Sequence, residues 1–258
     1  MAGKPNESLN ACERALAIQQ KLADANPSVA RFQRDMVSSY GSTGHALMDA
    51  GKPAEALAAF QRAREIMQKL ADANPNVIEF QSELSETHFH VGWALKQTGK
   101  PAEALAAFER AITVVQKLAD ADPQVTRWQN RLATILVYIG SLTREAGRTA
   151  EAVASYRRAV AIWTRLSSPT PLEFFNLACT HAELAGLAGE PGSGMTASEG
   201  RAEADRAMEW LRRAVAAGYH NVALMRSDAN LDPLRSRDDF QLLMMDLEFP
   251  DDLFARGD

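Results

Sequence analysis

The sequence of 258 residues predicts an all-α protein built from antiparallel helix pairs, and three observations lead to that fold class. The decapeptide GKPAEALAAF stands at 51–60 and returns at 99–108, within a repeat of 48 residues whose units begin at Gly3, Gly51, Gly99 and Gly147. Apolar residues recur at helical spacing, and no stretch shows the alternation that is typical of a strand. A fixed period of this kind indicates a solenoid, in which each unit buries its apolar face against its neighbours.

The unit at 51–98 shows how each unit is expected to form two helices. Pro53 suits the first position of a helix, where its missing N–H costs nothing. The buried face of this helix then follows helical spacing through Ala56, Phe60, Ala63, Met67 and Leu70. Asn74 is expected to cap the second helix and Pro75 to open it. Gly99 is expected to end the second helix with a left-handed turn.

The same signals divide the whole chain. Breaks near Pro27, Pro53, Pro75, Pro101, Pro123 and Gly147 predict nine principal helices. We expect a repeat array at 1–187, a long loop and the last repeat helix at 188–218, and a C-terminal helical cap at 219–258. The loop at 188–200 is rich in Gly, Ser and Pro, which predicts a mobile segment with little to bury. Within it, GEPGSGMT has the glycine spacing of a phosphate loop, but Met195 replaces the required lysine and no strand precedes it.

The small and aromatic residues of the units resemble those of the tetratricopeptide repeat family. One helix of each unit has a small, an aromatic and a small residue at spacings of four and three; these are Ala56–Phe60–Ala63, Ala104–Phe108–Ala111 and Ala152–Tyr156–Ala159. The small residue of the family's other helix is matched by Gly44, Gly92 and Gly140. The resemblance implies a right-handed superhelical solenoid. The period is longer than the family's usual ~34 residues. The difference adds about two turns to each helix, so the apolar residues of both helices stay on their buried faces.

The two copies at 51–98 and 99–146 differ mostly in one half. Positions 51–75 match the next copy at 19 of 25 places, whereas positions 76–98 match at only 4 of 23. The resemblance implies that the variable helices line a concave face, where ligands of this family bind. The predicted peptide groove consists of His45, Met48, Glu86, Phe89, Trp93, Lys96, Gln97, Val137, Ser141, Arg144, Phe175 and Cys179. Phe89 and Trp93 are expected to be its exposed aromatic anchor. The alternative is drift on a solvated face.

Nothing in the sequence indicates catalysis, a metal or a cofactor. The histidines lack metal-ligand spacing, and two cysteines form neither a disulfide framework nor a metal motif. A net charge of −5 argues against a nucleic-acid surface, and no apolar run is long enough to span a membrane. The absence of a signal-peptide core favours a cytoplasmic location.

The predicted function is therefore a non-catalytic protein–protein interaction module that binds a protein segment in its groove. The run from FFNLAC to DLEFPDDLFA resembles the C-terminal end of bacterial serine/threonine kinases that carry such repeats, although the kinase's own motifs are absent. That resemblance implies a sensor or scaffold region. The alternative is a structural role with self-association through the helix expected at 5–25, which lacks a preceding partner helix and suggests a piece of a longer protein. A small-molecule or enzymatic role in the groove is the third possibility.

Overall fold

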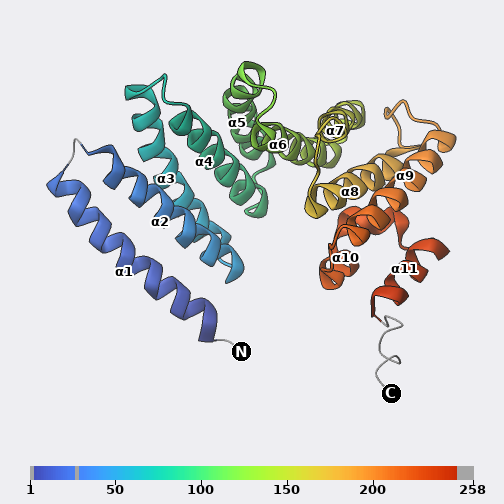
Figure 1. Cartoon of the computed structure of the whole chain (residues 1–258), viewed down its shortest axis with the longest axis horizontal. Coiled ribbons are helices and arrows are strands. Elements are labelled where there is room, and N and C mark those ends of the chain that lie inside the picture. The colour runs from blue at the N-terminus through green and yellow to red at the C-terminus, as the bar shows by residue number, and fades with distance from the viewer. Residues whose placement is uncertain (1–2, 27–28, 249–258) are drawn as a thin grey trace. The chain divides into compact units, whose positions relative to one another are not determined.

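The computed structural model describes residues 3–26 and 29–248, and their side chains from Arg14 onward, and it contains only helices there (Figure 1). The elements are α1 (Gly3–Ala25), α2 (Ala30–Asp49), α3 (Pro53–Ala73), α4 (Ile78–Gln97), α5 (Pro101–Ala121), α6 (Thr126–Glu145), α7 (Thr149–Trp163), α8 (Pro171–Leu187), α9 (Ala197–Ala216), α10 (Val222–Ser227), the 3-10 helix η1 (Ala229–Leu234) and α11 (Asp238–Glu248). The predicted all-helical fold is confirmed for this part of the chain.

The chain forms two compact units, residues 1–128 and 129–258, with the boundary inside α6. In the first unit, each of α1 to α4 packs against the next helix along the chain. In the second unit, α7 packs against α8, α8 packs against α9, and η1 also packs against α8. This neighbour-to-neighbour pattern is expected for repeats that bury their apolar faces on one another.

Proline and glycine set the helix boundaries as expected at most places. Pro53 and Pro101 stand at the first positions of α3 and α5. Gly51, Gly99 and Gly147 adopt φ values of 72°, 73° and 73°, in the left-handed region that side chains disfavour. These glycines reverse the chain after α2, α4 and α6.

The predicted role of Asn74 is wrong. Asn74 ends α3, where its side-chain Nδ2 donates to the carbonyl of Leu70 at 2.9 Å. The following helix starts at Ile78, with Val77 as its N-cap and no side-chain cap. A residue that precedes proline is disfavoured in helical geometry, so Asn74 leaves the helix and Pro75 lies in the turn.

Each aromatic residue of the repeat packs over a glycine of the preceding helix. A Cβ added to Gly92 would lie 2.8 Å from Cε1 of Phe108, and one added to Gly140 would lie 2.6 Å from Cε1 of Tyr156. Gly44 stands in the same relation to Phe60. All three aromatic side chains are fully buried. The glycines therefore let the rings approach the helix backbone closely.

The loop between α8 and α9 differs from expectation, because it has something to bury. Met195 is 6% exposed and joins the apolar cluster of α7 and α8. The hydroxyl of Thr149 donates to the carbonyl of Pro191 at 2.7 Å. Thr196 and Glu199 then form a capping box that starts α9. The expectation of a loop with little to bury is therefore wrong, since Met195 anchors it.

Candidate functional site

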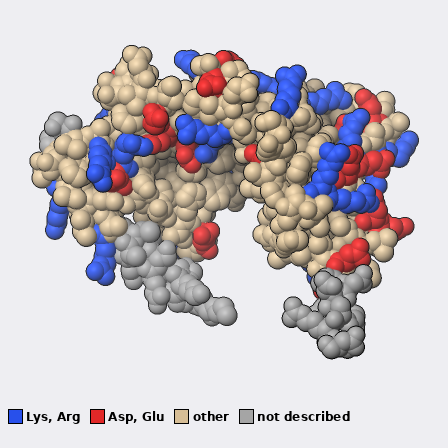
Figure 2. Space-filling model, viewed as in Figure 1, with Lys and Arg blue, Asp and Glu red and all other residues tan. Residues whose placement is uncertain are grey.

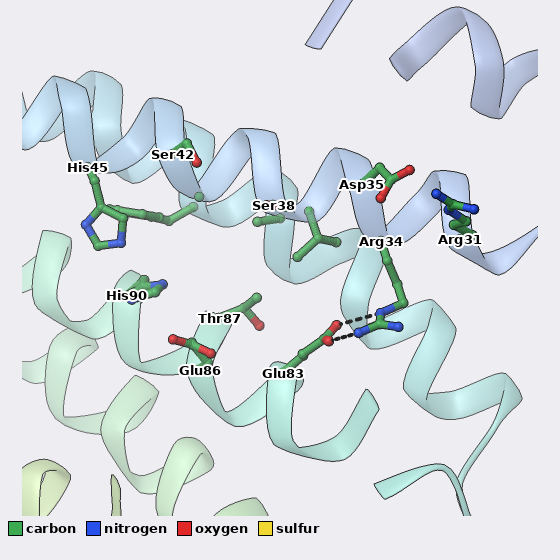
Figure 3. Close-up of a pocket in the computed structure, with 14 residues that line it drawn as sticks. Arg31, Arg34, Asp35, Ser38, Ser42, His45, Glu83, Glu86, Thr87 and His90 are labelled. Carbon is green, nitrogen blue, oxygen red and sulfur yellow. Dashed lines mark hydrogen bonds and ion pairs between the residues drawn. The ribbon is translucent and has the colours of Figure 1, made fainter. Parts of the chain in front are cut away.

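A groove of ≈ 640 Å³ lies in the first unit between α2 and α4, and two residues of α3 also line it (Figure 3). It is lined by Arg31, Arg34, Asp35, Val37, Ser38, Gly41, Ser42 and His45 of α2, Phe60 and Ala63 of α3, and Glu83, Glu86, Thr87 and His90 of α4. The lining thus combines charged, hydroxyl and aromatic groups. It suits a ligand with both polar and apolar parts.

An ion pair joins the two walls of the groove at one end. The Nε of Arg34 donates to Oε2 of Glu83 at 3.1 Å, and a second contact joins the same two side chains (Figure 3). The hydrogen bond to Glu83 raises the pKa of Arg34 above its usual value. Both side chains are partly exposed, so the pair contributes at most about 1 kcal/mol to stability. Its main effect is to tie α2 to α4.

Aromatic and imidazole rings gather at the other end of the groove. The ring centroids of His45 and His90 lie 4.6 Å apart, and those of Phe60 and His90 lie 5.1 Å apart. Trp93 contacts the same group, with its centroid 5.8 Å from that of His45 and 6.3 Å from that of Phe60. Edge-to-face and tilted contacts of this kind stabilise ring clusters.

The structure corrects the predicted aromatic anchor. Phe89 and Trp93 are half-buried rather than exposed. Phe89 points to the next repeat helix, where its ring lies 5.6 Å from that of Phe108. Neither residue belongs to the groove lining. The physical reason is that neighbouring rings of the chain itself cover them.

The other predicted residues of the first unit divide into two groups. His45 and Glu86 line the groove. Met48, Lys96 and Gln97 lie nearer the C-terminal ends of α2 and α4 and do not line it. Helix periodicity could have found two of the lining residues that were missed, because Ser42 stands three positions before the predicted His45, and His90 stands four positions after the predicted Glu86.

In the second unit, Arg144 belongs to an ion-pair network. Its guanidinium lies 2.6 Å from Glu183 and 2.9 Å from Glu190. The hydroxyl of Tyr156 donates to Glu183 at 3.4 Å, and burial followed by the Glu183 charge raises the Tyr156 pKa. Val137 and Ser141 are half-buried on α6. Arg144 is therefore committed to carboxylates of its own chain.

The C-terminal segment covers the predicted groove face of α8. Phe175 is 3% exposed, and the ring of Tyr219 stacks on it at 4.4 Å. Cys179 is 7% exposed, with Sγ 3.8 Å from Oδ2 of Asp228. Burial, together with the Asp228 charge, raises the pKa of the Cys179 thiol well above its usual value. Phe175 and Cys179 are thus core residues and not open to a peptide.

Surface charge, metal-ligand side chains and helix hydrophobicity can be followed over the described residues. Figure 2 shows basic and acidic side chains interspersed on the face that it draws. In the part of the chain that the structure describes, no group of three or more His, Cys, Asp or Glu side chains could hold a metal ion. None of the described helices is long and apolar enough to cross a membrane.

Comparisons with known proteins agree with the repeat fold. Family profiles described as tetratricopeptide repeat match residues 35–117 and 132–171. The apo form of RapI is 15% identical, with a TM-score of 0.59 over 95% of this chain and 77% of its own. Nearly identical TPR-like repeats of a protein designated a kinesin light chain from Podosopora anserina are 20% identical, with a TM-score of 0.51 over 83% of this chain and 88% of theirs.

A search of curated proteins finds no match. The structural likenesses show the fold alone, but the two profile matches coincide with the helix pairs and with the packing of glycine against an aromatic ring described above. Tetratricopeptide repeats are generally protein-interaction modules. Residues 35–117 and 132–171 of the chain therefore match the tetratricopeptide repeat family.

Proposed function

We propose that the groove between α2 and α4 binds a segment of a partner protein and that the chain acts as a non-catalytic interaction module. A volume of ≈ 640 Å³ falls within the range of ligand-binding pockets. Hydroxyl, carboxylate and imidazole groups along the walls supply donors and acceptors for a peptide backbone. The ring cluster at one end supplies an apolar surface for a side chain.

Gly41 is the observation that supports this proposal most directly. It lies in the middle of α2, where glycine costs about 0.5–1 kcal/mol relative to alanine. Packing does not require it, because a Cβ at this position would meet no atom within 4 Å. Gly41 lines the groove. A glycine there leaves room for a ligand to approach the helix backbone closely, which would account for its cost.

Gly44 provides the contrast within the same helix. A Cβ at Gly44 would collide with the ring of Phe60, so packing alone explains that glycine. Substitution of Gly41 should therefore affect binding, whereas substitution of Gly44 should affect folding. Gly41→Ala and Gly44→Ala add the same methyl group, one to the groove and the other to the packed interface.

The matched pair defines the test. A peptide ligand is first selected from a displayed library with the wild-type chain, and its dissociation constant is measured with each variant. We expect Gly41→Ala to bind at least about tenfold more weakly, or ~1.4 kcal/mol, with a melting temperature equal to or above the wild type. Gly44→Ala should instead lose about 1–3 kcal/mol of stability through overpacking. Equal affinity of Gly41→Ala and the wild type for every selected peptide would exclude this groove.

Self-association is the second candidate function, and the surface of α1 favours it. Ile18 and Leu22 stand one turn apart on this helix and are 62% and 43% exposed. Adjacent exposed aliphatic side chains are typical of a contact surface. Sedimentation should then show a dimer that Ile18→Lys converts to a monomer, whereas a monomeric wild-type chain would rule this function out.

A further inference from the structure

A second groove, of ≈ 790 Å³, lies in the first unit between α3 and α5, and the proposed function does not use it. Its lining consists of Arg64, Glu65, Gln68, Lys69 and Asp72 of α3, Gln81, Leu84 and His88 of α4, and Arg110, Thr113 and Val114 of α5. The charged groups that face His88 thus come from α3 and α5, on the two sides of its own helix.

His88 lies in this groove with an unsatisfied nitrogen. Its side chain is 6% exposed, and Nδ1 has no hydrogen-bond partner among the described residues. Burial, followed by the charges of Arg64 and Arg110, lowers the pKa of His88 to about 4. The imidazole is therefore neutral at pH 7, beside two cations. A buried polar atom without a partner is costly, so its presence needs an explanation.

The basic side chains of the groove are also uncompensated. Within residues 14–26 and 29–248, no ion pair involves Arg64, Lys69 or Arg110. The acidic residues of the lining have other partners. Glu65 pairs with Arg62 at 3.2 Å, and Asp72 accepts a hydrogen bond from Gln68 at 2.8 Å.

The second unit contains a buried histidine in a comparable setting, and there the chain supplies a carboxylate. His181 of α8 lines a groove with residues of α7 and α9, and its Nδ1 lies 2.5 Å from Oε2 of Glu203. The other carboxylate oxygen of Glu203 lies 2.6 Å from Arg206. Glu203 thus bridges an imidazole and a guanidinium. His88 has guanidinium groups nearby but no such carboxylate among the described residues.

Comparison of the repeats shows that the fold does not require polar side chains at the positions of Arg64 and His88. The next copy has Ile112 where the first has Arg64, and Leu136 where it has His88. Leu136 is buried in its own unit. An apolar residue therefore satisfies both equivalent positions, and the one equivalent to Arg64 lies in the half of the repeat that is nearly identical between the copies.

We infer that the groove between α3 and α5 binds a carboxylate group from outside the chain, held by Arg64 and Arg110 against the imidazole of His88. The ligand is either an acidic side chain of a partner segment or a small free carboxylate. In the second unit, the carboxylate of Glu203 takes the corresponding place beside His181 and Arg206. A carboxylate is the natural bidentate partner of arginine. This site is independent of the groove between α2 and α4.

The test follows the imidazole signals of His88 by NMR while either succinate or a terminally blocked triglutamate peptide is added. His88→Leu assigns the signal, and this substitution introduces the residue of the next copy. We expect saturable shifts and a raised pKa of His88, because a nearby anion favours the protonated imidazole. Arg64→Ile, which also takes the residue of the next copy, should weaken binding at least about tenfold. Lys117→Ala removes an exposed cation outside the groove and should leave binding unchanged.

The outcomes separate the two sources of the carboxylate and can overturn the site. Tighter binding of the peptide identifies an acidic partner segment, and tighter binding of succinate identifies a small carboxylate. The inference fails if neither probe gives a saturable shift of His88. It also fails if Lys117→Ala weakens binding as much as Arg64→Ile, since that would be a diffuse charge effect, or if only inorganic phosphate binds. Melting temperatures of the variants show that each one is folded.

Discussion

Replacement of Phe108 by alanine is expected to lower the free energy of unfolding by about 3–5 kcal/mol, the usual cost of truncating a large buried side chain. Phe108 is 0% exposed and packs over Gly92 of the preceding helix. Its ring also lies 5.6 Å from that of Phe89. Removal of the ring leaves a cavity between α4 and α5 that stacked helices cannot close without moving apart.

Urea unfolding followed by circular dichroism measures this loss. The control is Glu109→Ala, since Glu109 is the exposed neighbour of Phe108 on α5 and its removal should change stability by no more than about 0.5 kcal/mol. A Phe108→Ala variant as stable as that control would show that the ring does not hold the two helices together.

Replacement of Leu234 by alanine is expected to cost about 2–5 kcal/mol and to expose the covered face of α8. Leu234 of η1 is fully buried in the cluster that contains Phe175 and Cys179. The cap is short, so a cavity there should favour local opening. The Cys179 thiol should then become accessible to water and to thiol reagents.

The rate of thiol labelling reports this opening. The chain has two cysteines, so the experiment uses a Cys12→Ser background in which Cys179 alone reacts. We expect labelling to be slow in this background, because the thiol is buried and its pKa is raised, and at least about tenfold faster with Leu234→Ala. Leu242→Ala, at an exposed position of α11, is the control. Equal labelling rates in Leu234→Ala and the control would mean that residues beyond η1 protect Cys179.

The helices and their internal packing were predictable from the sequence, because local and repeated signals determine them. Proline at the first position of a helix and glycine after its end act through backbone geometry, which does not depend on the rest of the fold. The helical spacing of Ala56, Phe60 and Ala63 places them on one face. Since the same residues recur in the next copy, the same packing of an aromatic ring on a glycine could be expected in each.

The tertiary structure alone determines which helix faces are covered by other parts of the chain. Periodicity places Phe89 and Trp93 on the predicted groove face of α4, but rings from neighbouring helices partly cover them. It places Cys179 on a groove face, but Asp228, 49 positions later in the chain, lies against it.

The two grooves and the burial of the loop before α9 also could not be predicted from the sequence. The groove at Gly41 and the unsatisfied nitrogen of His88 depend on which side chains face each other across separate helices. Met195 becomes buried because α7 and α8 leave an apolar space beside the loop. A sequence pattern specifies which way a residue faces along its own helix, whereas burial depends on contacts between residues far apart in the chain.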